Sequence, residues 1–152
     1  MNTEVVLKEF NCIGIKNSCA FKDYPIEIPK TFDILHNRLN ELQDKVKQTA
    51  ALYEPGDKPG AEIIGTYYAT AVVDNTTIVP EGMARKIIPS RKYARLTHIG
   101  EMATIGKSYD KISAWIIENG YSHDRDWIIE LYGDNFDPGS PDSELEIYIP
   151  VK

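Results

Sequence analysis

The feature that most constrains the fold is an order of hydrophobic patterns that occurs twice along the chain. In the first half, β-branched residues predict strands over residues 5–15 and 63–73. Pro25 and Pro29 predict a break after the first strand. Apolar residues then recur at steps of three and four from Phe32 to Val46, which is typical of an amphipathic helix. Prolines and glycines over residues 55–60 predict a turn-rich break before the second strand.

The second half repeats this order of patterns. Apolar residues recur at helical spacing from Ile105 to Ile116, and Gly120 is placed to end that helix. The strands expected in this half cover residues 86–88 and 93–98, with a break at Pro89 and Ser90 between them, and then residues 126–132 and 144–150. An acidic loop with proline and glycine is expected between the last two strands.

The repeated order indicates an internal duplication. Displacing the first helix by 73 positions places Phe32 on Ile105, Leu39 on Ile112 and Leu42 on Trp115. We therefore predict an α+β fold made of a duplicated βαββ unit with pseudo-twofold symmetry. Its antiparallel sheet would carry two helices on one face and a ligand cleft on the other.

The length of the chain fits one domain. Its 152 residues are enough to bury a sizeable core. We expect a single domain over residues 1–152, with one half at about 4–74 and the other at about 82–151.

The charge balance argues against a nucleic-acid partner. The formal net charge is −6 and the pI is about 5.1, and such a surface repels polyanions. The basic residues gathered between positions 85 and 95 are expected to form a solvated face.

The spacing of potential ligands predicts neither a metal nor a cofactor. The histidines, His36, His98 and His123, are scattered, and Cys12 and Cys19 match no zinc or redox motif. Free thiols are typical of a reducing cytoplasm. The N-terminus lacks a signal-peptide pattern, and the longest apolar stretch is too short to span a bilayer. We therefore expect a cytoplasmic protein without membrane contact.

Strand alternation assigns the polar and aromatic residues to faces. In the last strand, Leu145, Ile147 and Ile149 share an aliphatic face that is expected to pack on the helices. Glu146 and Tyr148 lie on the opposite face. Matching like with like across strands places Glu130, Tyr132, Glu146 and Tyr148 together on the side away from the helices.

The result is a predicted sheet face that carries carboxylates among aromatic rings. The candidates for a ligand site are Glu130, Tyr132, Tyr148, Tyr67, Tyr68, Trp127, Glu146 and Phe21. Parity allows only one of Tyr67 and Tyr68 to face the cleft, and it puts Trp127 on the helix side. Aromatic faces attract cations by about 0.5–2 kcal/mol each, and a partly buried carboxylate adds a counter-charge. A solvated outer face covered by aromatic rings explains the same pattern.

Several short segments also carry a resemblance to a known family. They are Pro80 to Met83, Tyr93-Ala94, His98 to Gly100, Trp115 to Tyr121, Glu130 to Tyr132 and Glu144 to Val151. In this order and spacing, over nearly the whole chain, they resemble the GyrI-like small-molecule-binding domain, which is also the effector-binding half of AraC-type and multidrug-sensing regulators. The resemblance implies a duplicated βαββ fold with a cleft between the halves. It also implies that Glu130 matches the family's cleft glutamate, which acts with aromatic side chains on lipophilic cationic drugs.

The resemblance predicts a stand-alone small-molecule-binding protein that senses or sequesters lipophilic, cationic compounds. One alternative is a hydrolase of reactive electrophiles in which Glu130 is catalytic, since a carboxylate in an apolar pocket acts as a general acid or base. Another is a protein-interaction inhibitor of the gyrase type. No segment is expected to hold a helix-turn-helix, so a separate regulator or gyrase would be the macromolecular partner. Exposed strand edges predict a homodimer. The ligand's identity, its turnover and the oligomeric state stay open at this point.

Overall fold

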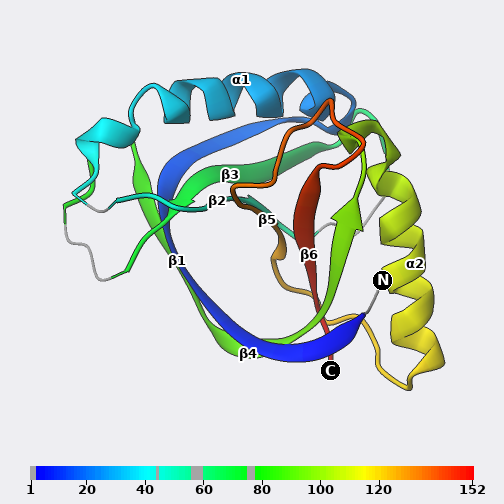
Figure 1. Ribbon diagram of the computed structural model, residues 1–152. Helices are drawn as coiled ribbons and strands as arrows, with labels where there is room; N and C mark the ends of the chain where they lie inside the picture. The colour runs from blue at the N-terminus through cyan, green and yellow to red at the C-terminus, as the bar shows by residue number, and fades with distance from the viewer. Residues whose placement is uncertain (1–2, 44, 56–59, 75–77) are drawn as a thin grey trace.

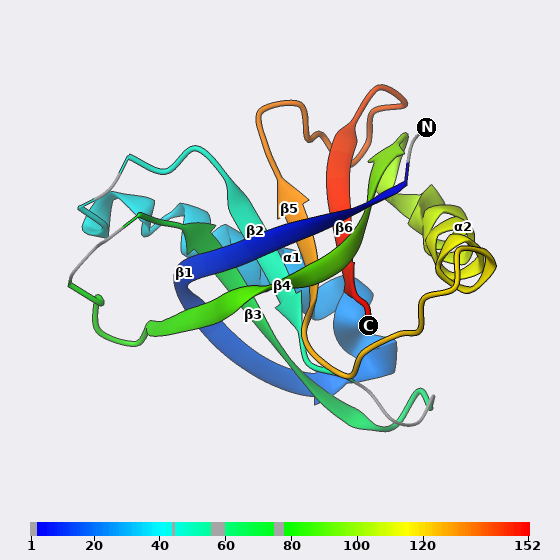
Figure 2. The same ribbon diagram turned by 90° about the horizontal axis from the view of Figure 1, so that it is seen from below.

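Six antiparallel strands form a sheet that closes on itself, and two helices lie against its outside (Figure 1, Figure 2). The computed structural model describes residues 3–43, 45–55, 60–74 and 78–152. The strands are β1 (Glu4–Ala20), β2 (Thr49–Tyr53), β3 (Ile64–Val72), β4 (Ala84–Ile99), β5 (Ile128–Tyr132) and β6 (Glu144–Pro150). The helices are α1 (Tyr24–His36) and α2 (Ile105–Glu118), with one-turn 3-10 helices η1 (Phe21–Asp23), η2 (Leu39–Glu41) and η3 (Met102–Thr104). The α+β fold class is confirmed.

The strands are ordered β1-β3-β2-β5-β6-β4 around the closed sheet. Closure comes from the two long strands, because β1 pairs with β4 as well as with β3. Each strand therefore pairs on both sides. This removes the exposed edges on which the expected homodimer was based, and the oligomeric state stays a prediction.

The duplicated β-α-β-β arrangement is confirmed, but the predicted offset of 73 between the helices is wrong. Tyr24 begins α1 and Ile105 begins α2, each directly after a 3-10 turn, so equivalent helix positions lie 81 residues apart. The strands β2 and β5 are equivalent at an offset of 79. No strand was predicted over β2, because its five residues include two alanines and carry little β propensity.

The offset was wrong because α1 begins and ends earlier than the apolar periodicity indicated. Pro25 lies in the first turn, where the missing N–H costs no hydrogen bond, so this proline starts the helix rather than interrupting the chain. The helix ends at His36. Leu39, Leu42 and Val46, which continued the pattern, pack after the helix end in a small separate cluster.

The strand β4 runs through Pro89, where a break was expected. The register between β1 and β4 shifts between Lys8 and Phe10, opposite this proline, as in a β-bulge. A bulge accommodates a residue that cannot donate to the ladder. At another position of β1, a Cβ on Gly14 would lie 1.9 Å from the carbonyl oxygen of Ala69, so only glycine fits the close approach of β1 to β3.

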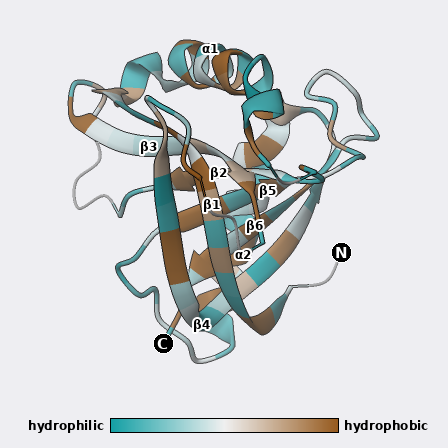
Figure 3. Cartoon of the chain, turned by 90° about the vertical axis from the view of Figure 1, so that its left-hand side faces the viewer, coloured by the Kyte–Doolittle hydropathy of each residue, from teal (hydrophilic) through white to brown (hydrophobic). Residues whose placement is uncertain are grey.

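Apolar side chains pack on both faces of the closed sheet. On the outer face, Ile112 and Ile116 of α2 bury Leu96 and Ile147. The other face carries a cluster whose largest members include Phe10, Tyr93, Ile129 and Tyr148. Hydrophobic and hydrophilic bands follow one another along the strands (Figure 3).

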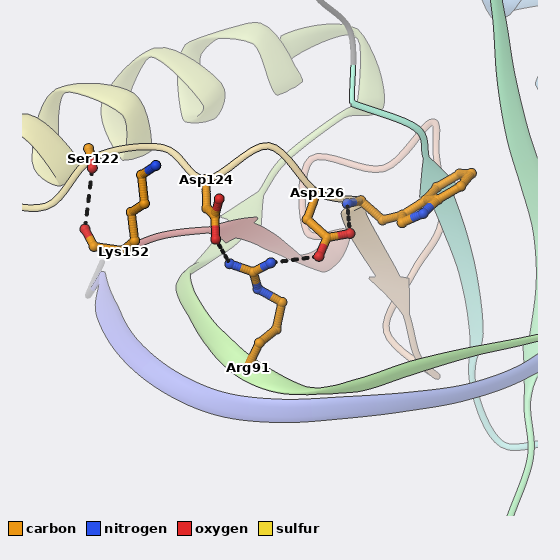
Figure 4. A network of polar contacts seen from close by, with 6 residues as sticks. Arg91, Ser122, Asp124, Asp126 and Lys152 are labelled. Atoms are coloured by element: carbon orange, nitrogen blue, oxygen red, sulfur yellow. Dashed lines mark hydrogen bonds and ion pairs between the residues drawn. The ribbon is translucent and has the colours of Figure 1, made fainter.

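One guanidinium fixes the segment that leads into β5. Nη2 of Arg91, on β4, lies 2.6 Å from Oδ2 of Asp124, and its Nη1 lies 2.6 Å from Oδ2 of Asp126 (Figure 4). Asp126 also accepts a hydrogen bond from the backbone N–H of Trp127. Part of the basic stretch is thus paired with carboxylates rather than only solvated. No helix in the described part of the chain is both long and apolar enough to cross a bilayer.

Candidate functional site

A cavity of about 640 Å³ lies between the two helices and the outer face of the sheet. The first turns of α1 form one wall, η3 and the start of α2 form the other, and β2 and β5 form the floor. Its lining residues are Tyr24, Pro25, Ile28, Pro29, Tyr53, Met102, Ala103, Ile105, Tyr109, Ile128 and Glu130. Glu130 supplies the carboxylate of this otherwise apolar and aromatic lining.

Three tyrosine hydroxyls donate hydrogen bonds to Glu130. Tyr109 of α2 donates to Oε2 at 2.5 Å, and Tyr132 of β5 donates to Oε1 at 2.6 Å. Tyr53 of β2 donates to Oε1 at 3.3 Å. Glu130 is only 4% exposed. Among the described residues, no lysine or arginine forms an ion pair with it.

Burial has the largest effect on the pKa of Glu130. Loss of water raises the pKa of Glu130, while the hydrogen bonds from Tyr109, Tyr132 and Tyr53 and the charge of His98 oppose the rise. Burial, together with the Glu130 charge, holds the pKa of all three tyrosines well above the usual range, so they stay neutral donors. The carboxylate is therefore hydrogen-bonded, but no lysine or arginine in the described part of the chain is paired with it.

The position of Glu130 follows from the duplication. It pairs with Ala51 at the centre of the β2–β5 ladder. Paired residues share a face, so the small Ala51 side chain leaves room for the longer one. Tyr53 and Tyr132 are equivalent residues of the two halves, and both donate to this carboxylate. The site thus lies where the two halves meet.

A second group of aromatic rings supports the α1 wall. Tyr24 stacks on Tyr53 at a centroid distance of 6.2 Å and meets Tyr67 edge-on at 5.2 Å. Tyr67 is fully buried, and its hydroxyl is hydrogen-bonded to Thr31 and Asn17. Phe21 also contacts Tyr24 edge-on. Of these predicted residues, Tyr67 and Phe21 therefore lie behind the wall rather than on it.

A buried histidine holds the opposite wall. Nε2 of His98 lies 3.1 Å from the carbonyl oxygen of Glu101 and donates to it, since a carbonyl only accepts. Nδ1 lies 2.7 Å from Oγ of Ser108. His98 thereby ties η3, which carries Met102 and Ala103, to the first turn of α2.

The predicted matching of strand faces was wrong. The ladder between β5 and β6 pairs Glu130 with Ile147 and Tyr132 with Leu145, so the glutamate lies on the helix-facing side. Glu146 and Tyr148 lie on the opposite face. Hydropathy matching failed because a buried carboxylate among tyrosines occupies a position where the pattern favoured an aliphatic residue. The cavity accordingly lies between helices and sheet, rather than on the far face as predicted.

The candidates on the opposite face do not reach this cavity. Tyr68 and Trp127 contact each other at 5.5 Å, with Nζ of Lys86 at 4.5 Å from the Trp127 ring. Tyr148 packs against Phe10 and Tyr93, and Glu146 pairs with Arg95. The structure thus brings together Glu130 and Tyr132 at the cavity and separates them from Tyr68, Trp127, Tyr148 and Glu146.

Three lining tyrosines were missed by the sequence argument. Tyr109 was assigned to the apolar stripe of its helix, Tyr24 precedes a proline that was interpreted as a break, and Tyr53 ends a strand that was not predicted. The correct duplication offset would have found Tyr53, because it aligns this residue with Tyr132. No group of three potential metal ligands occurs among the residues that the structure describes.

A comparison with known protein families identifies the family of this chain. The family described as Cass2, integron-associated effector binding protein, matches residues 5–151. The chain belongs to this family. Membership in the Cass2 family confirms the resemblance to effector-binding domains of the GyrI-like type. It also assigns the chain to effector-binding proteins.

Relatives of this chain include a regulator and several solved structures. The transcriptional regulator BrlR of Pseudomonas aeruginosa is 34% identical over 87 residues, which cover 56% of this chain and 32% of the regulator. The structure of SAV2435 bound to tetraphenylphosphonium matches with a TM-score of 0.73 and 18% identity, covering 100% of this chain and 94% of that one. The Vibrio cholerae integron cassette protein matches with a TM-score of 0.67 and 15% identity, covering 99% and 95%. These two likenesses establish the shared fold.

Proposed function

We propose that this chain binds lipophilic organic cations in the cavity above Glu130. The observation that carries the proposal is the buried Glu130 carboxylate, which receives three tyrosine hydrogen bonds but forms no ion pair with a lysine or arginine among the described residues. A buried charge without a counter-ion is costly, and a bound cation would offset that cost.

The remaining lining favours a lipophilic cation over a hydrated one. Ile28, Met102 and Ile105 offer apolar surface, and the rings of Tyr24 and Tyr53 offer π faces. A small hydrated ion would gain little from such walls. The SAV2435 structure bound to tetraphenylphosphonium supports this ligand class, because it shares the fold at full coverage.

Calorimetric titration with tetraphenylphosphonium tests the proposal. Glu130→Gln removes the charge and keeps the size of the side chain, and we expect affinity to fall by about tenfold or more. Glu146→Gln is the matched control, because Glu146 lies on the opposite face of the sheet. Equal affinity in wild type and Glu130→Gln, with both proteins folded, would refute the role of the carboxylate.

A second candidate function rests on the position of Glu130 in an apolar cavity, where burial raises its pKa and favours a general acid or base. The carboxylate would take a proton from water as the water oxygen bonds to an electrophilic carbon. It would return that proton to the leaving group as the bond to that group breaks. Turnover of a strained electrophile, lost in Glu130→Gln and retained in Glu146→Gln, would support a hydrolase. The absence of turnover for electrophiles that demonstrably bind would contradict it.

A further inference from the structure

A second cavity of about 420 Å³ continues the first along α1. Ile28 and Met102 line both cavities, from α1 on one side and η3 on the other. Since the same side chains form walls of both, the two cavities are neighbouring compartments of one groove. We name them the glutamate compartment, at Glu130, and the aromatic compartment, at Phe32, Tyr132 and Phe136.

Tyr132 joins the two compartments. Its hydroxyl donates to Glu130 in the glutamate compartment. Its ring meets Phe32 edge-on at a centroid distance of 5.6 Å and lies 4.5 Å from the Phe136 ring. A ligand that reaches the carboxylate therefore has an aromatic surface next to it, which continues away from the charge.

The aromatic compartment is suited to an uncharged group. Among its lining residues, Asp33 is the one carboxylate, and it is exposed to water on α1, as is His36. Neither side chain provides a buried counter-charge such as the one that Glu130 provides in the glutamate compartment. An apolar group would gain free energy from burial against the phenylalanine rings, whereas a second cation would keep its hydration outside.

We propose that the groove selects two-part ligands, in which a lipophilic cationic head lies at Glu130 and an uncharged apolar arm extends into the aromatic compartment. This inference rests on the proposed cation-binding function and adds the ligand class to it. The arm passes between Ile28 and Met102. The flexible thioether of Met102 adapts to arms of different thickness.

A series of alkyl-triphenylphosphonium salts with methyl, butyl and hexyl arms tests the inference by titration calorimetry. A fully buried methylene raises affinity by up to about fourfold, so the hexyl salt is expected to bind at least tenfold more tightly than the methyl salt. The methyl salt reports on the head alone and is the internal control in every variant.

Two variants test whether the arm lies in the aromatic compartment. Phe136→Ser removes an aromatic wall that lies outside the glutamate compartment, and Thr49→Leu adds bulk from β2 beside Tyr132. Both are expected to reduce the hexyl-to-methyl affinity ratio to about threefold or less while methyl binding stays within twofold of wild type. If Phe136→Ser fails to fold, Thr49→Leu alone decides.

The outcomes separate the two proposals. If affinity does not depend on arm length, or if a steep dependence persists in both variants, the arm does not lie in the aromatic compartment and the inference is overturned. Binding of the methyl salt would still demonstrate head binding in that case. Failure of every salt, including methyl, overturns the proposed function and the inference with it. A steep series that flattens in the variants supports both.

Discussion

The phenolic oxygen of Tyr109 on α2 lies 2.5 Å from Oε2 of Glu130 on β5. This hydrogen bond is the shortest of the three that the carboxylate accepts from tyrosines. This contact joins the second helix to the floor of the cavity. It also opposes the effect of burial on the charge of Glu130. The Tyr109 hydrogen bond therefore extends toward lower pH the range over which Glu130 is ionised.

Tyr109→Phe is expected to move the pH dependence of cation binding. Loss of the donor raises the pKa of Glu130 further, so affinity for tetraphenylphosphonium should reach its plateau at higher pH and should be up to about tenfold weaker than wild type at pH values below that plateau. Tyr53→Phe should have a smaller effect, because its bond is 3.3 Å long. Titrations at several pH values measure both, with Tyr121→Phe, outside the cavity, as control. Equal shifts in all three variants would contradict this ranking.

Cation binding is expected to release protons at pH values around the raised pKa of Glu130. The pKa of Glu130 is raised in the free chain, and a bound cation favours the ionised form, so the carboxyl loses its remaining proton on binding. Calorimetry in buffers of different ionisation enthalpy measures this release directly. A binding enthalpy that is independent of the buffer throughout the pH range over which the affinity changes would contradict the prediction.

Glu130→Gln is expected to change how folding stability depends on pH. The pKa of Glu130 is raised in the folded state above its ordinary value of about 4.5. The contribution of this side chain to the free energy of unfolding is therefore fully present below about pH 4.5, and it is lost as pH rises through the folded-state pKa. The variant should therefore be more stable than wild type at pH 8 by about 1 kcal/mol or more, and this advantage should shrink near pH 4. Urea unfolding at both pH values measures the difference. A constant difference would show that charge burial is not the cause.

Gly14→Ala is expected to destabilise the sheet severely. Its Cβ would lie 1.9 Å from the carbonyl oxygen of Ala69, which the paired backbones cannot relieve without separating, and the cost should be about 3 kcal/mol or more. Gly106→Ala is the control, since nothing lies within 4 Å of a Cβ at this exposed position of α2. There, alanine should stabilise by about 0.5–1 kcal/mol. Thermal unfolding of both variants tests the contrast.

Strand alternation and helix periodicity predicted the fold class and the chemical character of the site. Glu130 and Tyr132 were identified because strand alternation puts a carboxylate and a phenol on one face, and because Glu130 matches the cleft glutamate of the family that the chain resembles. Their surroundings depended on register, which pairs Glu130 with Ile147 and which hydropathy alone does not determine. Tyr24 was missed for a related reason, since a proline in the first turn of a helix resembles a proline in a break.

The pairing of Ala51 with Glu130 has an evolutionary consequence. These residues are equivalent in the two halves and face each other where the halves meet. Two identical subunits joined in the same way would carry two carboxylates at this point, or none. In one chain that contains both halves, the two positions can carry different residues, so Glu130 holds a charge while Ala51 is small. A single anionic centre on a twofold axis is thus a property that duplication permits and a symmetric dimer does not.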